Sequence, residues 1–89
     1  MSAQLDDITI AKVGKALRQV AEIKETYSER MATASSENER QELVLEAEDA
    51  AVEALDEQGL TVERYAAVLT AAEEDPDLEE RLVAAARDG

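Results

Sequence analysis

The chain has 89 residues and a formal net charge of -13 at pH 7, a size that allows one small domain. It contains neither Cys nor His, which excludes disulfides, zinc-finger sites and catalysis by a thiol or an imidazole. No apolar run approaches the roughly 20 residues that a membrane-spanning helix needs. Seventeen residues are Ala, the best helix former, and Tyr27 and Tyr65 are the only aromatic residues. We therefore expect an all-α chain whose helices approach one another closely.

Apolar residues recur at steps of three and four between Thr9 and Ala34, which predicts a first helix of about seven turns. A helix of this length would span the whole domain. Its apolar stripe on the helical wheel consists of Ile10, Val13, Ala16, Leu17, Val20, Ile23, Tyr27, Met31 and Ala34.

A second helix is predicted to start at Ser36 and to end at Gly59. Ser36 and Glu39 have the spacing of a capping box, and Gly suits the left-handed position after a helix. Its inner face consists of Leu43, Ala47, Ala50, Ala51, Ala54 and Leu55. The apolar arc reaches roughly 200°, too wide for a helix with one neighbour, because three more apolar residues flank this face: Val44, Leu45 and Val52. We expect this helix to be central or to carry a second interface.

Two shorter helices follow. Thr61 is a natural N-cap, and Leu60 and Tyr65 on either side of it have the spacing of a hydrophobic staple. The third helix is predicted to use an apolar face of Val62, Tyr65, Ala66, Leu69 and Ala72. Asp75 before Pro76 predicts the start of a fourth helix, with an apolar face of Leu78, Leu82, Val83 and Ala85.

These elements predict an all-α fold of about four helices, in which a short C-terminal helical hairpin packs on a long antiparallel helical hairpin. We expect residues 9–87 to form a single helical domain and residues 1–8 to form a flexible N-terminal segment. Tyr27 and Tyr65 lie on the apolar stripes of their helices. They should therefore be largely buried at the junction of the two hairpins.

The order of these packing and turn residues resembles a small bacterial family described only as a domain of unknown function, DUF4168. The resemblance covers the chain from Ile10 to Val83 and implies an exported protein of the periplasm or cell envelope, because family members usually follow a signal peptide. No signal peptide opens this chain, and the family's usual Phe near the start of the first helix is aliphatic here. The resemblance implies no catalytic or binding residue. Its motifs are Ile10-x-x-Val13-x-x-Ala16, Ile23-x-x-x-Tyr27, Glu46-Ala47, Gly59-Leu60-Thr61-x-x-x-Tyr65 and Asp75-Pro76-x-Leu78-x-x-Arg81.

The negative charge lies entirely in the second part of the chain. Residues 1–34 carry five basic and five acidic residues, whereas residues 35–89 carry four arginines and seventeen carboxylates. Like charges three and four residues apart destabilise a helix, and salt screens their repulsion. The same crowding should raise the pKa values of these carboxylates. A solvated face, adaptation to high salt and a dedicated basic partner or cation site all remain open. The second helix carries an arc of seven carboxylates: Glu39, Glu42, Glu46, Asp49, Glu53, Asp56 and Glu57.

The sequence contains no motif that carries chemistry. A Gly-rich phosphate loop, a calcium-binding loop and a di-iron motif are missing, so no cofactor or metal is expected. Nucleic acid is disfavoured because phosphate would repel the net negative charge.

We therefore expect a non-enzymatic helical interaction or structural module from a salt-adapted bacterium. It would bury Leu45 and Val52 against an unknown protein partner or a second copy. The alternative is a helical protein that binds a small ligand or cation, with Tyr27 and Tyr65 as contacts. A pocket shared by both tyrosine hydroxyls would favour the ligand, and a dry interior filled with Ala would favour the module.

Overall fold

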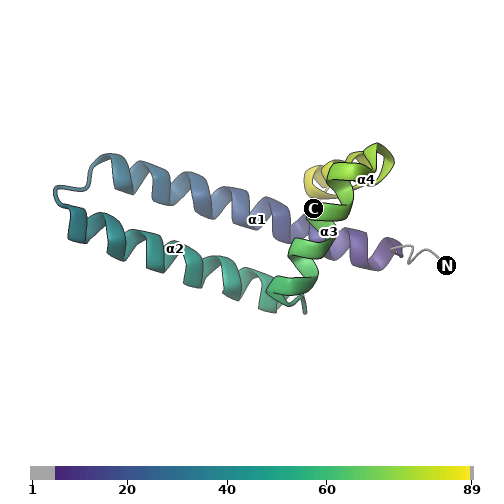
Figure 1. Cartoon of the computed structure of the whole chain (residues 1–89), viewed down its shortest axis with the longest axis horizontal. Helices are drawn as coiled ribbons and strands as arrows, with labels where there is room; N and C mark the ends of the chain where they lie inside the picture. The colour runs from purple at the N-terminus through teal and green to yellow at the C-terminus, as the bar shows by residue number, and fades with distance from the viewer. Residues whose placement is uncertain (1–5, 89) are drawn as a thin grey trace.

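The computed structural model describes residues 6–88 and contains four helices: α1 (Asp7–Ala32), α2 (Glu37–Glu57), α3 (Val62–Glu74) and α4 (Pro76–Asp88). No strand occurs among these residues, which confirms the predicted all-α fold. α1 and α2 lie side by side as an antiparallel hairpin (Figure 1). α3 and α4 pack across the end of this hairpin that is remote from the α1–α2 loop, and the molecule measures 51 × 23 × 21 Å.

α1 starts two residues before the predicted position because Asp6 caps it. The Asp6 carboxylate accepts a hydrogen bond of 2.7 Å from the Thr9 amide, and the Asp6 carbonyl accepts one from the Ile10 amide. Asp7 and Ile8 are therefore helical and do not belong to a flexible segment. Residues 1–5 of the segment expected at 1–8 lie outside the described residues. α1 also ends two residues earlier than predicted, at Ala32.

A capping box with a shifted return contact holds the start of α2. The Ser36 hydroxyl accepts a hydrogen bond of 3.1 Å from the Glu39 amide, as the spacing predicts. The Glu39 carboxylate reaches one residue further back than in the usual box. It accepts hydrogen bonds of 2.7 and 3.0 Å from the amide and the hydroxyl of Ser35. Both contacts fix the loop that reverses the chain between α1 and α2.

The end of α2 is a Schellman motif built on Gly59, whose φ is +71°. The Gly59 amide donates to the Asp56 carbonyl and the Leu60 amide donates to the Leu55 carbonyl, both at 2.9 Å. Leu55 and Leu60, which flank the motif, are both buried in the core. The predicted stop signal is thus confirmed, and it turns the chain toward α3.

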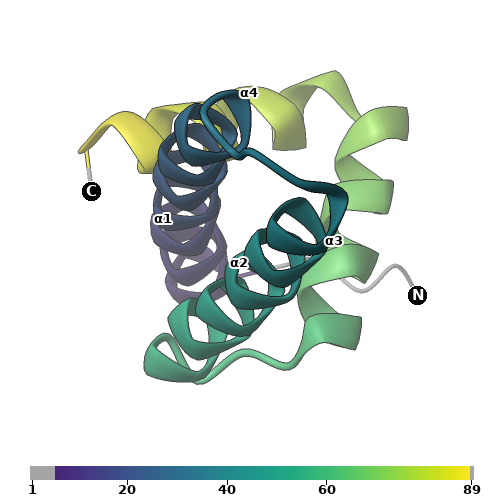
Figure 2. The ribbon, with the colours of Figure 1, turned by 90° about the vertical axis from the view of Figure 1, so that its left-hand side faces the viewer.

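The starts of α3 and α4 follow the sequence signals closely. The Thr61 hydroxyl accepts a 3.0 Å hydrogen bond from the Arg64 amide, and Asp75 Oδ1 accepts from the amides of Asp77 and Leu78 at 3.1 and 3.3 Å. Asp75 is the only residue between the two helices, so they meet at a corner (Figure 2).

The predicted apolar face of α3 is partly wrong. Val62 is 54% exposed and Ala66 is also exposed, whereas Val68, which was not expected on the inner face, is 3% exposed. The true face combines Tyr65, Val68, Leu69 and Ala72, which is rotated by about 50° from the predicted stripe at 100° per residue. This rotation arises because α3 packs mainly against α4 and makes few contacts with α2. On α4, Leu78 and Leu82 are buried as predicted, and Val83 is exposed.

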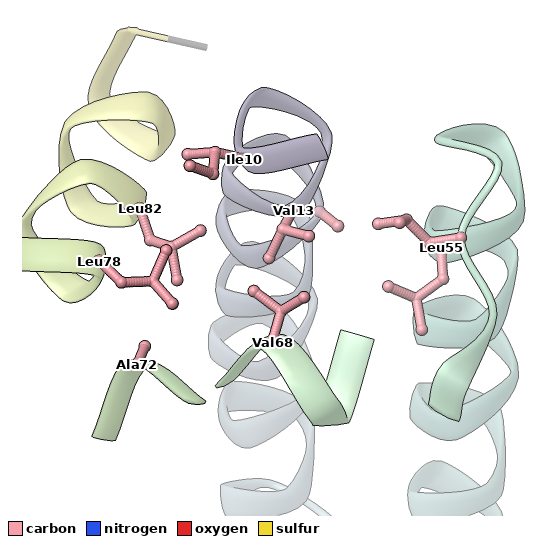
Figure 3. Close-up of a cluster of buried hydrophobic side chains, with 9 residues drawn as sticks. Ile10, Val13, Leu55, Val68, Ala72, Leu78 and Leu82 are labelled. Atoms are coloured by element: carbon pink, nitrogen blue, oxygen red, sulfur yellow. The ribbon is translucent and has the colours of Figure 1, made fainter. Parts of the chain in front are cut away.

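The core lies at the crossing of the four helices, at one end of the hairpin. Figure 3 shows side chains from all four helices converging there, with Val13 of α1 opposite Val68 of α3 and with Leu78 and Leu82 of α4 beside Ile10. The cluster is aliphatic throughout, and no polar or charged residue is fully buried among residues 6–88. Its buried members are Ile10, Val13, Ala16, Leu55, Leu60, Val68, Ala72, Leu78 and Leu82.

Candidate functional site

The part of the hairpin beyond the core has an apolar stripe but no buried residue. Every residue from Leu17 to Glu53, which we call the distal half of the hairpin, is half-buried or exposed. α3 and α4 lie at the other end, so α1 and α2 cover only each other here (Figure 1). The stripe predicted from the sequence is present but half covered: Leu17, Val20, Ile23, Tyr27, Met31 and Ala34 from α1 and its end, and Leu43, Ala47, Ala50 and Ala51 from α2.

An outer face of α2, formed by Val44, Leu45 and Val52, carries the most exposed apolar residues of the distal half. Leu45 is 62% exposed and Val52 is 44% exposed, although both were candidates for burial against a neighbour. They are seven residues apart and therefore lie two turns apart on one line of the helix. The wide apolar arc predicted for α2 thus leaves an uncovered surface.

A groove of about 480 Å³, which we call the hairpin groove, runs along α1 and α2. None of its lining residues belongs to α3 or α4, so it lies on a flank that these helices leave free. Its lining mixes apolar, acidic and amide side chains: Gln19, Glu22, Ile23, Thr26, Tyr27 and Arg30 from α1, and Ala50, Glu53, Ala54 and Glu57 from α2.

The two tyrosines lie in different places, and the prediction that both are largely buried at the junction is wrong. Tyr27 is half-buried in the hairpin groove, outside the core, with the Arg30 guanidinium carbon 5.0 Å from its ring centroid. Tyr65 is also half-buried and packs against the core cluster, where burial raises the pKa of its hydroxyl. Tyr65 is not among the residues that line the hairpin groove.

Small residues occupy several buried positions on the helices. Gly14, Ala16, Ala54 and Ala72 are buried, and Gly14 faces Ala85 of α4. Without side-chain bulk at these positions the helix axes come close together. Ala nevertheless supplies only three of the ten buried apolar residues, and the other seven are Leu, Val and Ile, so the interior is not filled with Ala.

The carboxylates have few partners within the chain. Three ion pairs occur among residues 6–88: Arg18 with Glu22 at 3.4 Å, Arg40 with Glu37 at 3.8 Å, and Arg81 with Asp7. All six side chains are largely exposed, so each pair contributes little to stability. The last pair links α4 to the first turn of α1.

Two carboxylates have lowered pKa values. Hydrogen bonds from Ser35 lower the pKa of Glu39, and hydrogen bonds from Thr9 lower the pKa of Asp6. The amides of a capped helix end stabilise the charged form of each carboxylate. The rise in pKa expected for the crowded carboxylates is therefore wrong for Glu39, whereas Asp6 lies outside the acidic part of the chain.

Other site classes find no support in the described part of the chain. Between residues 6 and 88 there is no group of three or more acidic side chains placed to hold a metal ion. None of the four helices is both long and apolar enough to cross a membrane.

Sequence reasoning missed Gly14, Val68 and the hairpin groove. A glycine within a long helical stripe costs helix stability and signals a close approach, so Gly14 was detectable. Glu53 and Glu57 were read only as part of a charged arc. Their position on the rim of a groove depends on the rotation of α2 against α1, which no local pattern reports.

The sequence model of a family described as a domain of unknown function (DUF4168) matches residues 6–82. The match begins at the residue that caps α1 and ends at Leu82, so it includes every buried residue of the core cluster. No curated protein and no solved structure matches the chain.

Proposed function

We propose that this chain, which belongs to the DUF4168 family, is a non-enzymatic helical interaction module that uses the outer face of α2 as its contact surface. One observation carries the proposal: the hairpin extends well beyond its core, and no residue from Leu17 to Glu53 is buried. A single hairpin with half-covered apolar residues gains stability when another surface packs against it.

A second copy of the chain is the partner that this surface fits. Leu45 and Val52 lie on one line of α2, so two such helices related by a two-fold axis can pack Leu45 of one copy near Val52 of the other. The net charge of -13 on each copy opposes this contact in dilute buffer. Salt removes the opposition because the Debye length falls to about 3 Å at 1 M.

Sedimentation velocity over a range of protein concentrations tests this role, from low salt to about 2 M NaCl. We expect a monomer in low salt and a dimer in high salt. Leu45→Glu should abolish the dimer. Val62→Glu, at a residue of similar exposure on α3, is the matched control and should leave it intact. A monomer under all conditions, or equal effects of the two variants, would overturn the proposed contact.

Adaptation to high salt is the second part of the proposal. Residues 35–89 carry seventeen carboxylates, and only three ion pairs form among residues 6–88. Such a surface is stable where salt screens its repulsion, and high net charge keeps a protein soluble there. Circular dichroism melts in increasing NaCl test this part separately from the dimer, as described in the Discussion.

A further inference from the structure

Apolar residues at regular helical spacing line the floor of the hairpin groove. Ile23 and Tyr27 are one turn apart on α1, and Ala50 and Ala54 are one turn apart on α2. Because alanine side chains are small, the α2 side of the groove projects little. On α1 the lining extends from Gln19 to Arg30, which corresponds to about 16 Å, or about three turns of a helix. The groove therefore has the length and the apolar character that suit an amphipathic helix.

The rim of the groove carries more negative than positive charge. Three carboxylates line it, those of Glu22, Glu53 and Glu57, against the single guanidinium of Arg30. Glu22 forms an ion pair with Arg18. Glu53 and Glu57 take part in none of the ion pairs found among residues 6–88. The α2 rim thus presents two carboxylates, one turn apart, that are available to a cation.

Two details of the groove indicate what kind of cation fits. The chain's own Arg30 places a guanidinium over the Tyr27 ring, so the groove already holds one planar cation against an aromatic side chain. Gln19 Oε1 is shielded from solvent and has no hydrogen-bond donor in reach, the single such side-chain atom found between residues 6 and 88. A donor that enters the groove could pair with this oxygen after a small rotation of the terminal torsion of Gln19.

We propose that the hairpin groove binds an arginine-bearing amphipathic helix of a partner protein. This inference rests on the proposed role as an interaction module but concerns a flank other than the outer face of α2. The apolar side of the partner helix covers Ile23, Tyr27 and the two alanines. Its arginines pair with Glu53 and Glu57, because a guanidinium matches a carboxylate with two parallel hydrogen bonds.

The same charges argue against the other occupants of this groove. Nucleic acid and anionic lipid carry phosphate, which the three carboxylates and the net charge of -13 repel. A second copy of this chain carries the same net charge, so it is disfavoured at low salt, where the attraction to a basic helix is strongest.

Isothermal titration calorimetry of the full chain with synthetic peptides tests the proposal. The probe is an amphipathic peptide of about 15 residues, long enough to form a helix, with arginines three and four residues apart and leucines on the other face. A peptide with lysines in place of the arginines has the same charge and is expected to bind several-fold more weakly, because an ammonium lacks the planar fork. Free arginine should show no binding.

A matched pair of double variants locates the site. Glu53→Gln with Glu57→Gln should raise the dissociation constant of the arginine peptide about tenfold, because charged hydrogen bonds at the rim of the groove are lost. Glu73→Gln with Glu80→Gln changes the net charge by the same amount at exposed positions on α3 and α4 and should leave the affinity unchanged. All four substitutions are at exposed residues, and circular dichroism confirms that each variant is folded.

The proposal fails if the arginine peptide does not bind, if the lysine peptide or free arginine binds equally well, or if both double variants weaken binding equally. Its failure is distinguishable from that of the proposed function. Leu45→Glu should not change peptide binding, and the double variant of Glu53 and Glu57 should not abolish the dimer formed in high salt.

Discussion

Gly14 of α1 lies against Ala85 of α4 so closely that no side chain fits between them. A Cβ atom at Gly14 would lie 2.5 Å from the Ala85 Cβ and 3.0 Å from the Ala85 carbonyl carbon and the Ala86 nitrogen. Two of these three neighbours are backbone atoms, which cannot move aside without the helix. The contact therefore sets how closely α4 docks on α1, beside the buried residues Ile10 and Leu82.

We expect Gly14→Ala to destabilise the fold, although Ala is the better helix former. The helix propensity gain of up to about 1 kcal/mol is opposed by overpacking, which costs about 1–3 kcal/mol in a close-packed core. Urea unfolding followed by circular dichroism measures the net effect. Ala85→Gly in the same chain should recover part of the loss, because it removes the nearest atom. A Gly14→Ala variant that is more stable than the parent protein would show that the helices separate freely.

Tyr65 should make the fold sensitive to alkaline pH. Burial raises the pKa of Tyr65 above its ordinary value of 10.0, so its hydroxyl ionises less readily in the folded state than in the unfolded state. Stability from this group is complete below pH 10 and is lost as the pH rises through the higher folded pKa. An ultraviolet absorbance titration should show a phase that ionises late. Tyr65→Phe should remove this phase, and a late phase that persists in Tyr65→Phe would contradict the prediction.

Acid should weaken the two helix N-termini that Asp6 and Glu39 hold. Their pKa values are lowered from ordinary values of 3.8 and 4.5, so the folded state favours the charged carboxylates. The stability they contribute is present above these ordinary values and is lost as the pH falls through the lower folded pKa values. Thermal melts from pH 6 to pH 3 should show a smaller acid loss in Asp6→Asn with Glu39→Gln than in the parent protein. An equal loss in both would contradict the role of the caps.

Added salt should raise the thermal unfolding midpoint. The carboxylates along α2 repel one another more in the compact state than in the extended chain, and NaCl screens this repulsion. Circular dichroism melts from low salt to about 2 M NaCl measure the effect. Glu42→Gln with Glu46→Gln, which removes two exposed charges from the arc, should raise the low-salt midpoint and flatten the salt dependence. A midpoint that stays constant or falls with salt would remove the case for salt adaptation.

The helix ends of this chain are predictable because the signals act over a few residues. Ser36, Thr61 and Asp75 each bond an amide two or three residues along the chain, and Gly59 has the positive φ that the stop of α2 needs. The face of α3 is not predictable in the same way. Val62 and Val68 are equally apolar, and only the way α3 packs against the other helices decides that Val68 is the buried one.

The two candidate surfaces also differ in whether the sequence predicts them. The exposure of Leu45 and Val52 follows from an apolar arc wider than one neighbour can cover, which the sequence of α2 shows by itself. The hairpin groove cannot be predicted from the sequence of one helix, because it joins residues of α1 to residues of α2 that are at least twenty positions away.

By itself, the amino-acid sequence determined that this protein is helical, where α2, α3 and α4 start, where α2 ends, and where its charge lies. Helix formation, capping and charge depend on neighbours within about one turn, and such neighbours can be read from spacing. Only the tertiary structure decided that the core gathers at one end, that Tyr27 and Tyr65 are kept apart, and that Glu53 and Glu57 border a groove. These features depend on how each helix is rotated and where it crosses its neighbours, and the packing of all four helices sets both.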